Sequence, residues 1–385
     1  MNIDSILNFG GNAGQYIIPF IIVLSIVVFV HEFGHYWVAR RCGVRVMTFS
    51  IGFGKEIFGW NDKHGTRWKV SWLPLGGFVK MFGDTDPAST PPGEEAVKAM
   101  TAKEKKVAFY SQSVAKRMAI VAAGPAANYV FAIVLLTGLF AFNGQPYTSP
   151  IVDKVMEKTA AAHVGMKPGD KVLKIDNDNI ESFEDIKRII LMNTGTPVHI
   201  LIERDGKEQT LNVTPDVVRM TDRFGSDHTL GRLGITSTVL AYRQLSLPQA
   251  LLQSFVEAWD LTASTLQGVG QMIAGVRDTE ELGGPLRIAE MSGKVAQEGV
   301  SSFVWFLIII SINLGLINLF PVPLLDGGHL VFYIAEAFRG KPISERIQEI
   351  SFKAGAALVL SLMLFSTWND LVHLRVISYI RNVFS

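Results

Sequence analysis

Four long stretches of apolar residues dominate the pattern of hydrophobic and polar positions along the chain. A bilayer core is crossed by a helix of about 20 largely apolar residues, and each of the four stretches is that long. The pattern therefore predicts four membrane-spanning helices joined by more polar segments. They are expected at about 16–37, 118–142, 303–325 and 354–373.

Basic residues are concentrated in two of the segments between these spans. Fourteen Lys and Arg residues lie between Val38 and Arg117, and four more follow the third span between positions 339 and 353. Loops rich in Lys and Arg stay in the cytoplasm, so both segments are expected there and both termini outside. The ends of the first and third spans then approach the cytoplasmic face together.

The first span ends in polar residues that are rare at such a depth. His31-Glu32-Phe33-Gly34-His35 is a His-Glu-x-x-His element, and on a helix its two histidines lie one turn apart on one face. Both imidazoles can therefore reach one zinc ion, and Glu32 lies where a general base can contact a water. A charged residue at bilayer depth costs about 2.5–3.5 kcal/mol on insertion scales, which favours a functional motif over a chance match.

A catalytic zinc site takes three protein ligands and leaves a fourth position open, so a further ligand is needed. Asp326 is the best candidate, because it follows the third span at a matching depth. The alternative is that Asp326 caps the next helix. His329 is a rival ligand, although its position three residues later favours a hydrogen bond to a ligand instead.

Two prolines interrupt the end of the third span. Pro321 and Pro323 remove helical donors and leave carbonyl groups in need of partners, which is expected where backbone lines a cavity. We expect these prolines and Asn318 to position the substrate. Asn318 has two further interpretations: it stabilises an oxyanion, or it only makes an interhelical hydrogen bond.

Between the first and second spans, residues 46–54 and 66–82 have the composition of strands and are joined by a polar turn. This predicts a membrane-associated β-hairpin or sheet on the cytoplasmic side. Its edge is expected to pair with an unwound substrate segment, and Gly76 and Gly77 permit the close backbone approach. An amphipathic hairpin that merely rests on the membrane is the alternative.

The long segment between the second and third spans lies outside in this orientation. A short strand at 150–155, helical periodicity at 183–193 and a hairpin around Asp205-Gly206 predict a compact α+β domain over 144–217. It resembles a PDZ domain of the circularly permuted bacterial type, which binds extended peptides; a plain spacer is the alternative. Residues 231–238 (GRLGITST) resemble the start of a second such domain, without the turn that should follow.

Residues 218–300 are expected to form an extracytoplasmic linker with one or two amphipathic helices on the outer membrane surface. Packing of these helices on soluble protein is the alternative. The first and last parts of the chain, 1–143 and 301–385, are then the two halves of one membrane core. The fold class is therefore a polytopic α-helical membrane protein with an inserted extracytoplasmic domain.

Composition agrees with a membrane protein. Of the 385 residues, 48% are hydrophobic and 18% are charged, below the quarter or so that is usual for soluble proteins. A net charge of +1 lacks the basic excess of nucleic-acid-binding proteins, so no nucleic-acid partner is expected. The single cysteine, Cys42, excludes an intrachain disulfide framework and a cysteine-cluster metal site.

Three motifs together resemble the site-2 protease family of intramembrane zinc metalloproteases, and especially its bacterial branch of regulator-of-sigma-E proteases. They are HEFGH at 31–35, GPAAN at 124–128 and NLFPVPLLDGGH at 318–329. PLGGFVKM at 74–81 and GGPLRIAE at 283–290 extend the resemblance over almost the whole chain.

The resemblance implies Zn²⁺ bound by His31, His35 and Asp326, with Glu32 as the base. It also implies a location in the bacterial inner membrane and substrates that are single-pass membrane proteins, such as trimmed anti-sigma factors or leftover signal peptides. The chain departs from close bacterial relatives in having room for one PDZ domain where they often have two.

The leading hypothesis is thus an intramembrane zinc endopeptidase whose partners are single-pass membrane proteins, membrane lipid and a peptide ligand of the PDZ domain. A second hypothesis is a membrane-anchored PDZ receptor or scaffold with a structural or vestigial metal site. A scaffold, however, has no need for Glu32 beside two helical histidines. A metal transporter is a third hypothesis, and it would require polar residues at mid-depth on several spans.

Overall fold

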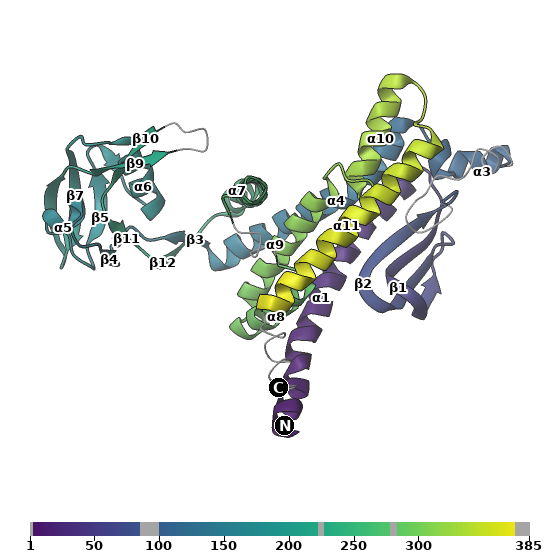
Figure 1. Ribbon diagram of the computed structural model, residues 1–385, viewed down its shortest axis with the longest axis horizontal. Helices are drawn as coiled ribbons and strands as arrows, with labels where there is room; N and C mark the ends of the chain where they lie inside the picture. Colours follow the sequence, from purple (N-terminus) through teal and green to yellow (C-terminus); the bar gives the residue numbers. More distant parts are fainter. Residues whose placement is uncertain (1–2, 85–99, 222–226, 278–282, 374–385) are drawn as a thin grey trace. The chain divides into compact units, whose positions relative to one another are not determined.

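The computed structural model describes residues 3–84, 100–221, 227–277 and 283–373. These residues divide into two compact units (Figure 1). The first unit is a membrane unit made of Met1–Gly138 and Leu251–Ser385. The second, here called the outer domain, is Leu139–Ala250, the segment between the two halves of the first. One continuous insertion therefore separates the halves of the membrane unit.

Within the described residues, four helices are long and apolar enough to cross a membrane, which confirms the predicted number of spans. Three of the four helices cover the stretches where the sequence predicted a span. The helices are α1 (Ile3–Arg41), α4 (Val114–Asn143), α9 (Val300–Asn318) and α11 (Glu345–His373).

The third span is shorter than the predicted 303–325. Helix α9 ends at Asn318, and residues 319–325 turn the chain before α10 begins at Asp326 and runs to Arg339. Pro321 and Pro323 cannot donate the hydrogen bonds that would extend α9, and Leu324 has a φ of +99°, which no helix contains. Asp326 is the first residue of α10 rather than its N-cap, which is Leu325.

Shorter helices join the spans of the membrane unit. Helix α8 (Pro285–Glu298) packs on α1, and its first turn is capped by the buried carboxylate of Asp370 on α11. Val23 and Val27 of α1 are buried against Phe306 and Leu307 of α9. The other helices of this unit are α3 (Ala102–Val107) and most of α7 (Leu247–Ile273).

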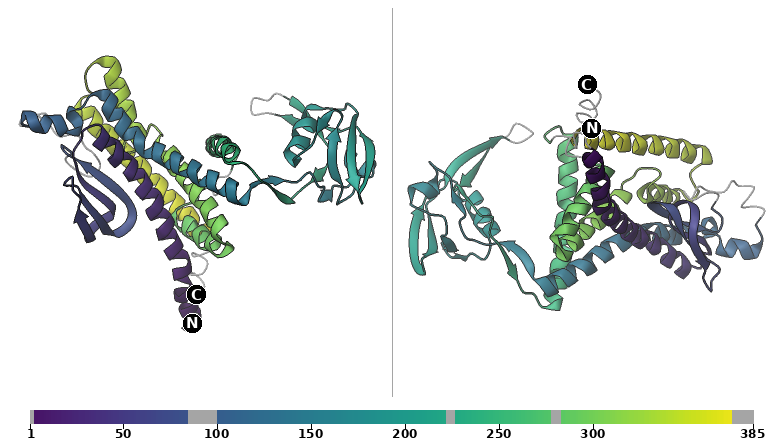
Figure 2. Two further views of the ribbon diagram at one scale, coloured as in Figure 1. Left: turned by 180° about the vertical axis from the view of Figure 1, so that it is seen from behind. Right: turned by 90° about the horizontal axis from the view of Figure 1, so that it is seen from below.

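The predicted β-segment is present as two long antiparallel strands beside α1 (Figures 1 and 2), which are β1 (Val46–Asn61) and β2 (Arg67–Met81). Both are irregular, because Ile51 of β1 lies opposite both Val70 and Gly77 of β2. The turn between the strands is tied to α1 by a hydrogen bond of 2.9 Å from the Tyr36 hydroxyl to Asp62. The turn, and the start of β2 that follows it, are thereby held next to the helix that carries His31 and His35.

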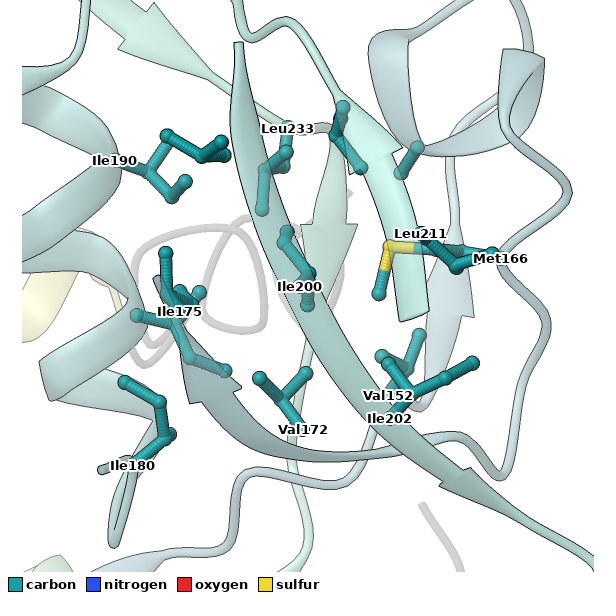
Figure 3. Close-up of a cluster of buried hydrophobic side chains, with 14 of the residues drawn as sticks. Val152, Met166, Val172, Ile175, Ile180, Ile190, Ile200, Ile202, Leu211 and Leu233 are labelled. Carbon is teal, nitrogen blue, oxygen red and sulfur yellow. The ribbon is translucent and has the colours of Figure 1, made fainter. Parts of the chain in front are cut away.

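The outer domain is built around a four-stranded sheet with the order β6-β5-β7-β8. Its core consists of aliphatic side chains between the sheet and helix α6, and Figure 3 shows Ile175, Ile200 and Ile202 in this cluster. The elements up to the predicted boundary are β3 (Gln145–Thr148), β4 (Lys154–Val155), α5 (Ala160–His163), β5 (Lys171–Ile175), β6 (Asp178–Asn179), α6 (Phe183–Met192), β7 (Val198–Arg204) and β8 (Lys207–Val213).

The outer domain extends beyond residue 217, where the sequence pattern placed its end. Strand β11 (Ile235–Thr236) pairs with β4, β12 (Leu240–Arg243) pairs with β3, and Leu233 is buried in the domain core. The hairpin of β9 (Asp216–Thr221) and β10 (Asp227–Arg232) precedes them. Residues 231–238 therefore belong to this one domain, not to a linker or a second domain. Short strands that pair with partners about 80 residues earlier leave no local periodic pattern.

Candidate metal centre

Helix α1 brings His31 and His35 together inside the membrane unit. The two residues are one helical turn apart, and both are only 8% exposed. Their Nε2 atoms lie 3.2 Å from one another. The spacing in the sequence thus places two imidazole nitrogens at one buried point, as the motif predicted.

Asp326 reaches the same point from the start of α10. Its Oδ2 atom lies 3.1 Å from His31 Nε2 and 3.5 Å from His35 Nε2. In the described part of the chain, these three residues form the only group of His, Cys, Asp and Glu side chains arranged to hold a metal ion. The predicted convergence of the first span with a residue nearly 300 positions later is present in the fold.

The three atoms fit a zinc ion. A tetrahedral ion with bonds of about 2.0–2.1 Å separates its ligand atoms by about 3.3 Å, close to the three distances found here. Asp326 Oδ2 is buried and accepts no hydrogen bond from the described residues. A cation between the three atoms would satisfy this oxygen and the imidazole lone pairs together.

The far nitrogens of the two imidazoles also have neighbours. His35 Nδ1 lies 2.9 Å from the carbonyl oxygen of Ile120 on α4, so its N–H donates there and leaves the Nε2 lone pair free for a metal. His31 Nδ1 lies 3.3 Å from the side-chain amide of Asn128, also on α4. Helix α4 therefore sets the orientation of both rings.

Gly124 allows α4 to come this close. A Cβ atom at Gly124 would lie 2.2 Å from His35 Nε2 and 2.9 Å from His31 Cε1, which no side chain permits. The sequence motif GPAAN pointed to this segment but not to its role. The spacing of this glycine and the asparagine one turn later could have indicated that role. It puts both residues on one face of a helix within an apolar span.

A cavity of about 290 Å³ opens beside the three atoms, and five of the other residues singled out in the sequence line it: Glu32, Asn318, Gly76, Gly77 and His329. Pro321 and Pro323 are not among the lining residues, although they form the turn that ends α9. His329 lines the cavity, but its ring lies against Phe352 at a centroid distance of 5.2 Å, and it is not one of the three converging residues.

The end of β2 lies directly against Glu32. A Cβ atom at Gly77 would be 3.1 Å from Glu32 Cγ and 2.7 Å from the carbonyl oxygen of Ser50. A larger residue at position 77 would therefore push the strand away from α1. The glycine keeps extended backbone next to the carboxylate that the motif predicts to be the base.

Two polar contacts between elements of the membrane unit were not predicted from the sequence. Arg117 of α4 pairs with Glu336 of α10 at 2.6 Å, and its guanidinium lies over the ring of Tyr333. The pair attaches α10, and hence Asp326, to α4.

The second contact involves Asp62, in the turn of the β-segment. Burial raises the pKa of Asp62, but hydrogen bonds from Trp68, the Thr66 backbone and Tyr36 outweigh burial and lower this pKa to about 2. Asp62 is therefore ionised at neutral pH and holds the turn to α1.

Comparison with known proteins gives matches over most of the chain. The model of peptidase family M50 matches residues 19–362. A protein of Agrobacterium fabrum named as a zinc metalloprotease is 42% identical over 360 residues, which cover 92% of this chain and 95% of the relative. Metalloprotease MmpA of Caulobacter vibrioides is 35% identical over 392 residues, covering 96% of this chain and 98% of the relative.

Solved structures match a smaller part of the chain. The PDZ domain of the SdrC-like protein Lmo2051 from Listeria monocytogenes is 22% identical, with a TM-score of 0.19, and the match covers 24% of this chain and 90% of that one. The PDZ domain of the SdrC-like protein Lin2157 from Listeria innocua is 20% identical, with a TM-score of 0.20, covering 25% and 99%.

Proposed function

Because this chain belongs to peptidase family M50 and is a zinc metalloendopeptidase of the site-2 protease type, we propose that it cleaves peptide bonds within membrane-spanning segments of single-pass membrane proteins. The observation that carries the proposal is the convergence of His31, His35 and Asp326 beside Glu32, where an apolar span ends. A hydrolytic site at this place meets substrate segments that are themselves in the bilayer.

His31, His35 and Asp326 are the proposed zinc ligands, through the two Nε2 atoms and Oδ2. The distances of 3.1–3.5 Å between these atoms support the assignment. When bound, zinc supplies a Lewis acid that activates water and polarises the scissile carbonyl. The protein's part is to hold three ligands rigidly and to leave a fourth side open to the cavity.

Glu32 is the proposed general base. It neighbours His31 on α1, lines the cavity and faces the end of β2. Its carboxylate takes a proton from the attacking water and returns it to the nitrogen of the leaving amine, so the residue ends the cycle unchanged. Such proton transfer contributes about 10²–10⁴-fold to rate.

The cavity walls suit an extended substrate. Peptide bonds of a helix are shielded by their hydrogen bonds, so a substrate helix must unwind before attack. We propose that the unwound segment pairs with the backbone at Gly76 and Gly77, because these residues line the cavity at the end of β2. Asn318, at the end of α9, is the proposed polar contact to the substrate, and Pro321 and Pro323 support it by ending the helix there.

The proposed substrates are of the anti-sigma-factor or signal-peptide-remnant type, as in regulated intramembrane proteolysis. The proposed location is the bacterial inner membrane, with both termini outside and the active site towards the cytoplasm. The basic segments at 38–117 and 339–353 support this orientation.

The outer domain is proposed to be a PDZ domain that binds a peptide or limits substrate size. Its cavity of about 270 Å³ lies between α6 and residues 231–235, with an apolar lining that includes Phe183, Ile186 and Leu233. Lys187 and Arg232 also line this cavity and supply positive charge for a peptide carboxylate.

Replacement of Glu32 tests the proposed chemistry against a scaffold with a vestigial metal site. Glu32→Gln should retain zinc but slow cleavage of a reporter membrane segment by at least about 100-fold, since the amide cannot take the proton. Glu349→Gln, which alters an exposed carboxylate paired with Lys353, is the matched control and should cleave normally. Cleavage by Glu32→Gln at the unmodified rate would exclude Glu32 as the base.

A further inference from the structure

Asn128 is a buried polar side chain that the proposed chemistry does not yet use. It is 0% exposed, within an otherwise apolar stretch of α4. One end of its amide lies 3.3 Å from His31 Nδ1. The other end, Oδ1 as placed, is buried and has no hydrogen-bond partner among the residues that the structure describes. The one direct side-chain hydrogen bond of this buried amide is therefore to His31.

The chemistry of an imidazole ligand determines which end of the amide faces it. If Nε2 of His31 binds the metal, the ring proton is on Nδ1, which then needs an acceptor. An amide NH₂ group cannot accept this proton, whereas the amide oxygen can. The two ends of an asparagine side chain have nearly the same shape, and a half-turn about the Cβ–Cγ bond exchanges them.

We propose that Asn128 is a positioning residue whose side-chain oxygen accepts the Nδ1–H of His31 and thereby fixes the ring with Nε2 towards the metal. The proposal rests on the ligand assignment made above. In this arrangement the Nδ1–H of His31 has an acceptor, just as the Nδ1–H of His35 has the Ile120 carbonyl oxygen. Each ligand histidine is then oriented by α4, one through backbone and one through a side chain.

The backbone of Asn128 is itself fixed. The buried hydroxyl of Ser311 on α9 donates a hydrogen bond of 3.0 Å to the carbonyl oxygen of Asn128. Gly124, one turn earlier on α4, contacts both imidazoles closely. The amide therefore has little freedom to move away from His31, as a positioning role requires.

Two replacements of similar size separate this role from simple packing. Asn128→Leu removes both hydrogen-bonding ends, and Asn128→Asp keeps an acceptor and adds charge. If Asn128 only fills space in an apolar helix, Leu is the harmless change and Asp is the harmful one, because an unpaired buried charge is costly. If it orients His31, the order is reversed, because a carboxylate is a common partner of a metal-bound histidine.

The measurement is the zinc dissociation constant of the full chain in detergent, obtained by competition with a chelator. We expect Asn128→Leu to weaken zinc binding by about 10–100-fold, as loss of a ligand's hydrogen-bond partner typically does. Asn128→Asp should bind zinc at least as tightly as the unmodified chain. Asn313→Leu is the matched control: its amide oxygen accepts from Thr265 between two helices, and Asn313 neither lines the cavity nor belongs to the three converging residues, so zinc affinity should not change.

The outcomes distinguish this inference from the proposed function. Unchanged zinc affinity in Asn128→Leu, or an equal loss in Asn128→Asp, overturns the role of Asn128 alone. Unchanged affinity in Asp326→Ala, measured in the same series, overturns the ligand assignment instead. If Asn128→Leu does not fold, as judged by thermal unfolding without metal, Asn128→Ala takes its place with the same expected loss.

Discussion

Two aspartates, one in each unit, have buried carboxylate oxygens with opposite kinds of neighbour. In the outer domain, both oxygens of Asp170 accept from the guanidinium of Arg204, at 2.6 and 2.7 Å, and Oδ2 also accepts from the backbone N–H of Lys167 at 2.8 Å. In the membrane unit, Asp326 Oδ2 lies 3.1 Å from His31 Nε2 and 3.5 Å from His35 Nε2. One carboxylate is paired with a permanent cation, and the other is not.

The difference shows which of the two carboxylates has its charge compensated by another side chain of the protein. Burying a carboxylate without a compensating charge costs several kcal/mol, and Arg204 supplies that charge to Asp170 from within the same domain. Histidines that bind a metal ion are neutral, so in a zinc-bound centre the ion, and not a side chain, would compensate the charge of Asp326. The charge of Asp170 is therefore compensated within the chain, whereas the metal centre is completed from outside it.

The largest expected effect is that of Asp326→Ala. Zinc affinity should fall by more than about 100-fold, since loss of a direct ligand exceeds loss of a ligand's hydrogen-bond partner.

The check is thermal unfolding with and without zinc, beside elemental analysis of the purified protein. Zinc should raise the unfolding temperature of the unmodified chain, because it binds the folded state, but not that of Asp326→Ala. An undiminished zinc content in the variant would move the third ligand elsewhere, with His329 as the next residue to test.

The next largest effect is expected at Gly124. Gly124→Ala places a methyl group where His35 Nε2 lies 2.2 Å away, so one helix must shift and zinc affinity should fall by about 10–100-fold, as for other losses of ligand orientation. Gly138→Ala is the matched control on the same helix, where an added Cβ meets nothing within 4 Å. It should leave zinc binding unchanged; equal loss in both variants would show that helix α4 tolerates no alanine, rather than that the metal centre needs this glycine.

The sequence predicted the parts of this arrangement that repeat locally. Four apolar stretches gave the spans, and the spacing of His31 and His35 placed two ligands on one face of a helix. Asp326 was identified as the third ligand because it follows the third span at the same depth as the two histidines. That inference needs only the order and orientation of the spans. The structure places all three within hydrogen-bonding distances of one another.

What the sequence could not predict depends on contacts between distant segments. The pairing of β11 with β4 extends the outer domain past residue 217, and two-residue strands have no period to detect. The closeness of Gly124 to His35, and of Asn128 to His31, depends on how α1 crosses α4. Each such contact joins residues about 90 positions apart, beyond the reach of any local pattern.

The smallest expected effect tests the other side of the comparison. Asp170→Asn leaves Arg204 without its charged partner, which should lower the stability of the outer domain by about 3 kcal/mol. This is the low end of the values for buried pairs, and it applies because a quarter of the Arg204 side chain is exposed. Hydrogen exchange of the β5 and β7 amides in the full chain measures this loss. Zinc affinity should not change, because the pair belongs to the outer domain.

The stability of the outer domain should also depend on pH through the Asp170–Arg204 pair. Burial raises the pKa of Asp170, but hydrogen bonds from Arg204 and from the Lys167 backbone outweigh burial and hold the pKa below its usual range. A carboxyl whose pKa is lower in the folded state stabilises fully above its unfolded pKa of about 3.9 and loses that stabilisation as the pH falls through the folded value. The protection factors of the β5 and β7 amides, corrected for the intrinsic pH dependence of exchange, should therefore fall in acid for the unmodified chain, and less steeply for Asp170→Asn. An equal acid response in both would mean that other carboxylates, and not this buried pair, make the outer domain sensitive to acid.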